Sequence, residues 1–391
     1  MMKAEISKFQ RPAEFASWDA ATGIKKLEVS FGDSNSNPNS ARAGQIYANG
    51  NNQICVIVRV QAQDSSNRAI TNPSQQLQSS IFSALYLVNR ADMSKLDWNT
   101  NAHGQWWFTT QPNAFLSNPS GQQVLAERPP VDTFFTVGDD GTITYVFYVL
   151  CPSTENRRGI GIAAAVFNVP DGHSGTKTFD CAGNTSGIAQ SIVTLAAKDP
   201  QDFSASELQT SVHRQIDNHR PPGRDDHDYL DIHTWTAPSW ITIYSMDWAN
   251  GSSAGECSDR DYYRRGVDAS WLIYGSVYLP NSNGNGSLSA RTYSRFMGDC
   301  LIYNLGGFNG KNYNDYVYFD VTVQANQIVV NKVIGTGFSF YKDDWDRCSN
   351  YTYTYVDVVD NFGTRRRLRF APITTTDEGT GPQITSQVIR S

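Results

Sequence analysis

The stretch QICVIVRVQA, residues 53–62, determines the fold class that this chain is expected to adopt. Apolar residues occupy every second position from Ile54 to Ala62. Successive side chains of a β-strand point to opposite faces, so these apolar side chains share one face. The stretch therefore predicts a long β-strand with one face in a hydrophobic core.

Short apolar segments of the same kind recur through the first half of the chain, separated by polar turns. The triplet Asp139-Asp140-Gly141 is a hairpin signal, because aspartate followed by glycine favours the backbone of tight turns. Seven or more strands in about 175 residues predict a decorated β-sandwich. The other expected strands are residues 27–31, 83–88, 105–108, 142–149, 159–167 and 191–195.

The segment around the long strand expected at residues 53–62 also has a recognisable order of elements. A short strand within residues 44–50 ends in Asn49-Gly50, the long alternating strand follows, and an acidic turn comes next at residues 64–67. Over about thirty residues this order resembles the bacterial immunoglobulin-like repeats of invasin-type adhesins. The resemblance implies an immunoglobulin-like sandwich in this part of the chain.

A second module follows, and it is rich in tyrosine. Fifteen of the nineteen tyrosines lie after residue 200. A short Gln/Ala/Asn turn separates residues 316–323 from residues 328–330, which are therefore expected to form a hairpin. The further strands expected here are residues 240–244, 271–274, 301–303, 351–359 and 368–370.

One helix is expected between the modules. The sequence Ser204-Ala205-Ser206-Glu207 matches a capping box, in which the serine and the glutamate each bond the backbone amide of the other. Leu208, Val212 and Ile216 follow at four-residue spacing, as on one face of a helix. Pro221-Pro222-Gly223 would end such a helix.

These signals predict an all-β protein with two immunoglobulin-like or jelly-roll-like β-sandwich modules joined by one short helix. The expected parts are an N-terminal arm (1–25), a β-sandwich module (26–200), a helical connector (201–224), a Tyr-rich β-sandwich module (225–375) and a flexible tail (376–391).

Charge and apolar patterning limit the partners. The net charge of −6 provides no basic footprint, so nucleic acid is not an expected partner. No apolar run approaches the roughly 18 residues of a membrane span, so no transmembrane segment is expected. Residues 1–7 lack the apolar stretch of a secretory signal peptide, which indicates cytoplasmic synthesis followed by release or export along a leaderless route.

The six cysteines are too sparse for a disulfide scaffold, and no two of them have C-x-x-C spacing. Cys55 and Cys151 lie inside strand patterns and are expected to be buried thiols. A basic run at residues 365–369 alternates into an apolar stretch. A charged outer strand face explains this run better than a polyanion site does.

The sequence contains no G-x-S-x-G elbow and no phosphate-binding loop. The densest cluster of titratable residues follows Pro221-Pro222-Gly223, and within it His227, Asp231 and His233 could bind one divalent metal ion. A solvated loop between the modules is the favoured interpretation, because the cluster follows a Pro-Pro-Gly break where polar loops are common. No cofactor other than this metal ion is expected.

Two groups of tyrosines are candidates for binding residues. Tyr351, Tyr353 and Tyr355 alternate along one expected strand, and Tyr316 and Tyr318 do so along another. The opposite faces carry valine, isoleucine and phenylalanine, which places the tyrosines outward or in an interface. Tyrosine suits subunit contacts and sugar stacking, although a partly buried layer is the structural alternative.

Together these features favour a non-enzymatic binding or assembly protein of an extracellular or particle-borne apparatus. It would be adhesin-like, phage-tail-like or toxin-associated, and would recognise a cell-surface glycan or a neighbouring protein subunit as a homo-oligomer or assembly component. A secreted β-rich toxin, pore-forming or of another kind, is the first alternative. A metal-dependent hydrolase that uses His227, Asp231 and His233 is the second.

Overall fold

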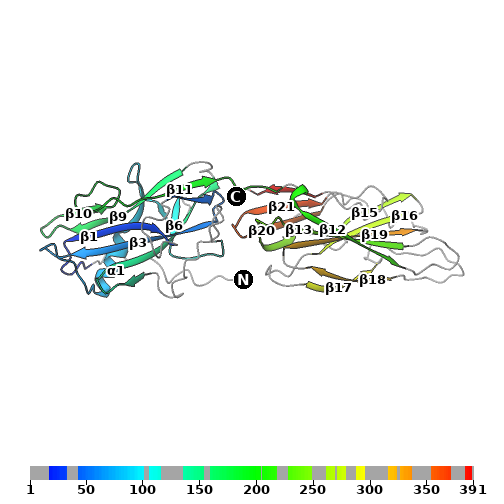
Figure 1. The fold of residues 1–391 in the computed structure, drawn as a ribbon, viewed down its shortest axis with the longest axis horizontal. Coiled ribbons are helices and arrows are strands. Elements are labelled where there is room, and N and C mark those ends of the chain that lie inside the picture. The colour runs from blue at the N-terminus through cyan, green and yellow to red at the C-terminus, as the bar shows by residue number, and fades with distance from the viewer. Residues whose placement is uncertain are drawn as a thin grey trace. The chain divides into compact units, whose positions relative to one another are not determined.

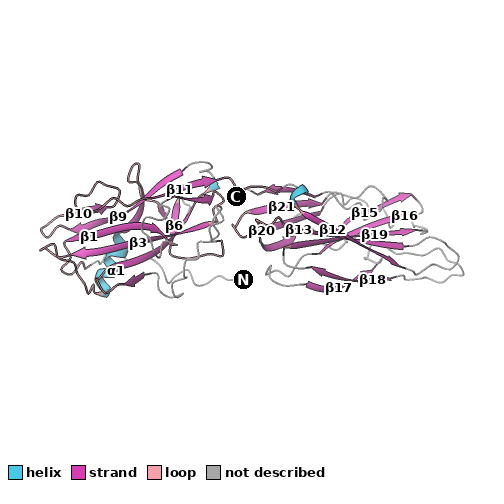
Figure 2. Ribbon diagram, in the orientation of Figure 1, coloured by secondary structure: helices cyan, strands magenta, loops and turns pink. Residues whose placement is uncertain are grey.

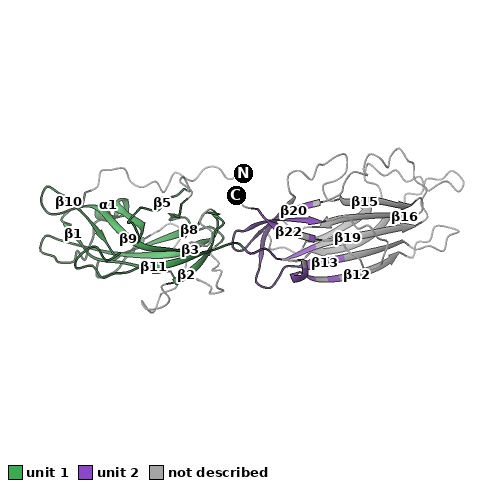
Figure 3. Ribbon diagram, turned by 90° about the horizontal axis from the view of Figure 1, so that it is seen from above, with its two compact units in different colours: residues 1–200, 390–391 green, residues 201–389 purple. Residues whose placement is uncertain are grey.

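The computed structural model describes residues 17–32, 43–100, 105–115, 135–153, 159–203, 205–217, 228–248, 261–268, 271–278, 288–295, 316–323, 326–336, 354–370 and 384–389. Within these ranges the elements are strands, apart from one α-helix and short 3-10 turns (Figures 1 and 2). The predicted all-β fold is therefore confirmed. The chain divides into two compact units, Met1–Pro200 with Arg390–Ser391, and Gln201–Ile389 (Figure 3).

The first sheet of the N-terminal unit is built around the stretch that determines the fold class. In strand β3, Val56, Val58 and Val60 are fully buried, as the alternation predicts. The strand is central because it pairs antiparallel with β1 on one side and β8 on the other. The sheet order is β1 (Gly23–Phe31), β3 (Gln53–Gln63), β8 (Ile143–Leu150), β6 (Trp107–Thr109) and β5 (Asp97–Trp98), with β7 (Phe135–Val137) also paired to β8.

A second sheet completes the N-terminal sandwich. Residues from both sheets, including Val58 and Phe147 from the first and Leu87 and Ala164 from the second, belong to one buried apolar cluster. The two sheets therefore share one core. The order of the second sheet is β10 (Thr176–Asp180), β9 (Gly159–Pro170), β11 (Val193–Lys198) and β2 (Ala43–Tyr47), with β4 (Leu85–Asn89) also paired to β9.

The α-helix of the described chain, α1 (Gln75–Ala84), lies between β3 and β4 in sequence. The Ser74 hydroxyl caps it by accepting the amide of Leu77 at 3.1 Å. Leu77, Ile81 and Phe82 are buried, and the Phe82 ring stacks on Phe147 with centroids 6.4 Å apart. Within the described ranges no helix is long and apolar enough to span a membrane.

The predicted connector helix is wrong. Only Ala205–Glu207 form a 3-10 turn, and residues 209–217 form strand β12, which pairs antiparallel with β13 along its whole length. The four-residue spacing of Leu208, Val212 and Ile216 misled the prediction, because four is an even number. Residues four apart share a face of a strand as well as a face of a helix, and pairing with β13 satisfies the backbone of β12.

The C-terminal unit also contains two larger sheets. Trp235 and Ile328 from one, with Val356, Val358 and Phe370 from the other, belong to a single buried cluster. The first sheet has the order β12 (Gln209–Asp217), β13 (Asp228–Thr236), β19 (Gln327–Thr336), β16 (Trp271–Tyr278) and β15 (Asp261–Asp268). The second has the order β14 (Ile243–Trp248), β20 (Thr354–Asp360), β21 (Arg365–Phe370) and β22 (Ile384–Val388).

The predicted hairpin in this unit is also wrong. Strand β18 (Tyr316–Val323) pairs with β17 (Leu288–Arg295), whereas β19 pairs with β13 and β16. Adjacency in sequence suggested the hairpin. Pairing is decided by which strands bury their apolar faces together, and here consecutive strands belong to different sheets.

The turn at Asp139-Asp140-Gly141 is the predicted hairpin turn, since it joins the antiparallel strands β7 and β8. The amide of Gly141 donates to the carbonyl of Gly138 at 2.9 Å. Gly141 has φ +78°, and a Cβ at this position would overlap the carbonyl oxygen of Ile70. Both the backbone conformation and the space require glycine here.

Gly141→Ala should lower the free energy of unfolding of the N-terminal unit by about 3 kcal/mol or more, because backbone strain adds to a clash with main-chain atoms. Gly50 is the matched control, with φ +73° and no atom within 4 Å of the position that a Cβ would occupy. Gly50→Ala should cost only about 1 kcal/mol. Chemical denaturation measures both values, and equal losses would contradict the clash at Ile70.

Cys55 and Cys151 are buried thiols, as predicted, and Cys181 is a third. Burial raises the pKa of the Cys181 thiol to about 11. At pH 8 only about one molecule in a thousand would carry the thiolate at Cys181, and the thiolate is the reactive form.

In the native protein these three cysteines should therefore resist alkylation at pH 8, and all three should label within minutes in denaturant. Mass spectrometry of the alkylated peptides measures this difference. Rapid labelling of Cys181 before unfolding would contradict the buried environment.

Candidate binding face

The structure describes the side chain of one predicted binding tyrosine, Tyr355. Tyr351 and Tyr353 lie outside the described residues. Tyr316 and Tyr318 belong to strand β18, but their side chains are outside the described set. The candidate site is therefore built around Tyr355.

Strand β20 places Tyr355 opposite the core. Val356 and Val358 point inward and are 0% and 1% exposed. Tyr355, Asp357 and Val359 alternate with them on the other face and are half-buried. The alternation therefore directs the tyrosine away from the core, as the sequence predicts.

The neighbouring strand β21 carries the basic run. Arg365 is exposed and Arg367 and Arg369 are half-buried, while Leu368 and Phe370 are buried on the other side of the strand. The predicted charged outer face is thus present at three of the four arginines. The prediction is wrong for Arg366, which is 1% exposed and points inward.

An ion pair joins the two strands on the outward face. Asp357 and Arg367 are cross-strand neighbours. The Arg367 Nε and Nη2 atoms donate to the Asp357 Oδ1 and Oδ2 atoms at 2.8 and 3.0 Å, a two-point contact that fixes the guanidinium plane. This hydrogen bonding raises the pKa of Arg367 above its ordinary value.

The fixed guanidinium lies beside the tyrosine. The Arg367 Cζ atom is 5.9 Å from the centre of the Tyr355 ring, within cation–π range. We call the aromatic and charged side chains on the outward side of β20 and β21 the Tyr-Arg face. It consists of Tyr355, Asp357, Arg365, Arg367 and Arg369. The face combines a flat ring, a held guanidinium and further positive charge, which suits non-covalent recognition.

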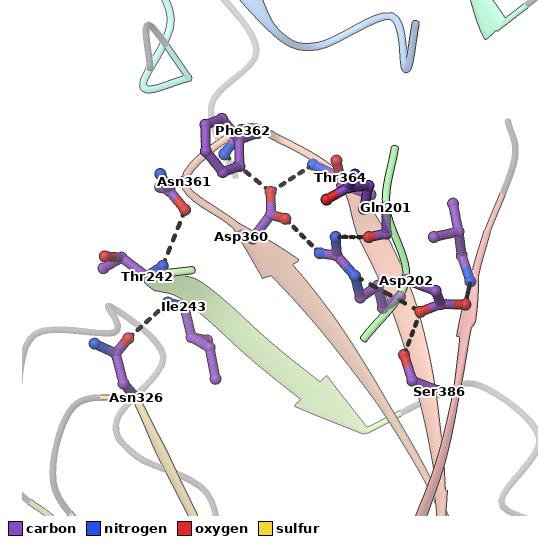
Figure 4. A network of polar contacts seen from close by, with 12 residues as sticks. Gln201, Asp202, Thr242, Ile243, Asn326, Asp360, Asn361, Phe362, Thr364 and Ser386 are labelled. Atoms are coloured by element: carbon purple, nitrogen blue, oxygen red, sulfur yellow. Dashed lines mark hydrogen bonds and ion pairs between the residues drawn. The ribbon is translucent and has the colours of Figure 1, made fainter. Parts of the chain in front are cut away.

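A buried ion pair lies on the inner side of the same two strands (Figure 4). Arg366 Nη1 bonds Asp360 Oδ2, and the two side chains are 1% and 0% exposed. Asp360 Oδ1 also accepts the amides of Phe362 and Thr364, each at 2.9 Å. The aspartate therefore holds both the tight turn between β20 and β21 and the inward arginine.

Arg366 also ties the beginning of this unit to the sheet. Its Nη2 donates to the carbonyl oxygen of Gln201 at 2.5 Å, and its Nε lies 3.8 Å from Asp202 Oδ1. Asp202 in turn accepts the Ser386 hydroxyl at 2.6 Å and the Val388 amide at 3.0 Å (Figure 4). One network thus connects residues 201–202 to β21 and β22.

Asparagine side chains fix the first strand of the sheet in the same region (Figure 4). Asn361 Oδ1 accepts the Thr242 amide at 2.9 Å, and the Asn361 amide donates back to the Thr242 carbonyl at 2.8 Å. Asn326 Oδ1 accepts the Ile243 amide at 2.6 Å. Side-chain acceptors therefore align the start of β14 with the turn that carries Asp360.

The predicted metal ligands are only partly described. His233 is 3% exposed, and its ring stacks on Trp235 with centroids 5.6 Å apart. His227 lies outside the described residues, and Asp231 belongs to β13 with its side chain outside the described set. Across the side chains that the structure describes, no group of three or more His, Cys, Asp or Glu residues could hold a metal ion. The metal site stays a prediction.

Sequence reasoning missed both ion pairs. A signal existed for the outward pair, because Asp357 and Arg367 lie at similar distances before and after the turn at Asn361-Phe362-Gly363. Strand residues related in this way about a turn become cross-strand neighbours.

Comparison with known proteins yields neither a matching family model nor a matching curated protein. Solved structures give only coarse similarities, and three of them are streptococcal proteins. The C-terminal domain of the Streptococcus agalactiae AgI/II polypeptide BspA is 9% identical, with a TM-score of 0.24 over 87% of this chain and 97% of that chain.

The C-terminal domain of the Streptococcus pyogenes antigen I/II-family protein AspA is 8% identical, with a TM-score of 0.23 over 95% of this chain and 100% of that chain. The S. agalactiae serine-rich repeat protein Srr2 is 9% identical, with a TM-score of 0.19 over 95% of this chain and 94% of that chain. Scores this low assign neither a family nor a function.

Removing one partner of the buried pair should strongly destabilise the C-terminal unit. Arg366→Met leaves the Asp360 carboxylate buried without its cation, which should cost about 3–5 kcal/mol. Adding Asp360→Asn removes the orphaned charge and keeps an oxygen for the turn amides, so the double variant should regain most of that loss.

Denaturant unfolding, with hydrogen exchange of β21 to locate the change, measures these effects. The exposed pair Lys26–Glu28, at 3.2 Å with side chains 39% and 40% exposed, provides the control. Glu28→Gln should cost less than about 1 kcal/mol. A single variant at Arg366 that is as stable as the control would contradict the role of the network.

Proposed function

We propose that this chain is a non-enzymatic binding or assembly protein that uses the Tyr-Arg face to recognise a glycan or a neighbouring protein subunit. The observation that carries the proposal is the Tyr355 ring beside an Arg367 guanidinium held at two points by Asp357. These side chains lie outside the core, while the valines between them fill it.

The rigidity of this face supports binding. Strands β20 and β21 pair from Thr354↔Phe370 to Val359↔Arg365, and the Asp360 carboxylate holds the turn that joins them. Side chains on such a hairpin lose little conformational freedom when a ligand is bound. The entropy lost on ligand binding would therefore offset little of the favourable free energy of the contacts at this face.

The residue types support the same proposal. A tyrosine ring offers a flat apolar surface and a hydroxyl, which suits stacking on sugars and contacts between subunits. Arginine offers several fixed donors to carboxylates and similar groups. We infer a recognition role in an extracellular or particle-borne apparatus, of an adhesin-like, phage-tail-like or toxin-associated kind, with the chain acting as a homo-oligomer or assembly component.

The proposal predicts that Tyr355→Ser removes binding without unfolding the protein. A glycan array identifies sugar ligands, and analytical ultracentrifugation detects self-association of the intact chain. Loss of an interface ring costs about 1–2 kcal/mol, so Kd should rise roughly 5- to 30-fold. Circular dichroism should be unchanged, since Tyr355 lies outside the core.

Tyr86 provides the matched control, because it is also half-buried and lies beside a cation, with Lys95 Nζ 4.0 Å from its ring centre. Tyr86→Ser should leave binding unchanged. A folded Tyr355→Ser protein that binds its glycan or subunit as tightly as the original would overturn the proposal.

A further inference from the structure

We propose that residues 237–245 form a stacking site for a neutral glycan, with the rings of Trp240 and Tyr244 as its two platforms. The site includes the start of β14, the strand next to β20 in its sheet. It would bind independently of the Tyr-Arg face and so adds a second recognition surface to the proposed function.

Two exposed aromatic rings lie close together on this segment. Among the described residues three large apolar side chains are exposed, those of Val137, Trp240 and Tyr244, at 42%, 36% and 48%. Two of the three are therefore only four residues apart. Ile241 and Ile243 between them are 3% and 4% exposed and belong to the core of the C-terminal unit. The segment thus fills the core with isoleucine and presents both rings to solvent.

The alternation also sets the spacing of the rings. Trp240, Thr242 and Tyr244 are exposed at alternate positions. Alternate residues of an extended chain share a face and repeat every ~6.5–7 Å, so the two rings are attached to the backbone ~13 Å apart. One oligosaccharide of a few sugars can therefore cover both rings, with Thr242 between them.

A β-bulge places Tyr244 at an edge of the sheet. The register with β20 passes from Ile243↔Asp360 to Ser245↔Val359, so Tyr244 is the extra residue of the bulge. A bulge re-aims a side chain and interrupts the hydrogen-bonding edge. Strand β14 is an edge strand, because among the described strands it pairs with β20 alone. The bulge disfavours addition of a peptide strand here, whereas stacking on the ring needs no backbone pairing.

The backbone between the two rings is held before any ligand binds (Figure 4). The Thr242 amide donates to Asn361 Oδ1 at 2.9 Å, and the Thr242 carbonyl accepts the Asn361 amide at 2.8 Å. The Ile243 amide donates to Asn326 Oδ1 at 2.6 Å. A segment fixed in this way loses little conformational entropy when a ligand is bound.

The composition of the segment indicates an uncharged ligand. Residues 237–245, APSWITIYS, contain no charged residue and carry hydroxyl groups at Ser239, Thr242 and Ser245. Aromatic rings can stack on the apolar faces of sugars, and hydroxyl groups can exchange hydrogen bonds with those of sugars. A neutral glycan fits this chemistry, whereas an acidic glycan would need cations beside the rings.

The strand register keeps charge away from the segment. Asp360, opposite Ile243, is fully buried and pairs with Arg366. Val359, opposite Ser245, is uncharged.

Charged residues follow further along the sheet. Asp247 of β14 lies opposite Asp357 of β20, and Arg365 of β21 is separated from Ser245 by Val359. The two acidic residues disfavour an anionic ligand that extends along β14.

The test uses the full chain with three neutral oligosaccharides: cellohexaose, N-acetylchitohexaose and mannohexaose. Isothermal titration calorimetry gives Kd at low and high NaCl, and hydroxyl-radical footprinting read by mass spectrometry locates the bound sugar. The unmodified protein should bind at least one of the three, with a Kd that NaCl hardly changes. That oligosaccharide should shield Trp240 and Tyr244 from oxidation.

Trp240→Leu with Tyr244→Leu should raise Kd for that oligosaccharide roughly tenfold or more, because leucine keeps an apolar surface but offers no flat ring. Trp240→Phe with Tyr244→Phe should retain most of the binding, since both rings remain. Val137→Ser is the control, because it removes the exposed apolar side chain of the N-terminal unit. It should bind as the unmodified protein does, and circular dichroism should be unchanged in all three variants.

Three results would overturn the inference: no binding to any of the three oligosaccharides, an unchanged Kd in the leucine variant, or loss of self-association rather than of sugar binding in that variant. The last result would assign the rings to a contact between subunits. The proposed function is tested separately by Tyr355→Ser, which leaves both rings in place. Sugar binding that survives Tyr355→Ser but not the leucine variant would support this site and count against the Tyr-Arg face.

Discussion

The alternation of side chains along a pleated strand is the constraint on which the rest of this structure depends. In β3 it gathers Val56, Val58 and Val60 into the core of the N-terminal unit. In β20 the same alternation sends Val356 inward and Tyr355 outward. A strand that contributes to a core necessarily presents a second face, and the candidate binding face is the second face of two core strands.

Arg366 shows how this constraint is met when a charged residue falls on the inner face. Burial of a lone guanidinium would be prohibitively unfavourable, so the fold supplies the Asp360 carboxylate and the Gln201 carbonyl. The same carboxylate holds the turn between β20 and β21. The outward face thus depends on the buried ion pair between Asp360 and Arg366. Asp360 holds the turn of the hairpin whose two strands position the outward side chains.

Prediction from the sequence succeeded where a pattern had one physical meaning. Five apolar residues at period two in residues 53–62 fit a strand and no regular helix. Prediction failed at Leu208, Val212 and Ile216, where the spacing fits either element, and β12 is the outcome. The helix at residues 75–84 was missed because the first half of its sequence, QQLQSSIFSA, holds a single apolar residue, Leu77.

The sequence by itself determined that this protein is built from strands, that Cys55 and Cys151 are buried and that Tyr355 lies opposite the core. Each of these is a local property, set by residue type and by alternation within one segment. Only the tertiary structure decided which strands pair, that Asp357 meets Arg367, and that Arg366 enters the interior beside Asp360. These contacts join residues across a turn or between distant segments, and their register follows from the burial of whole strand faces together.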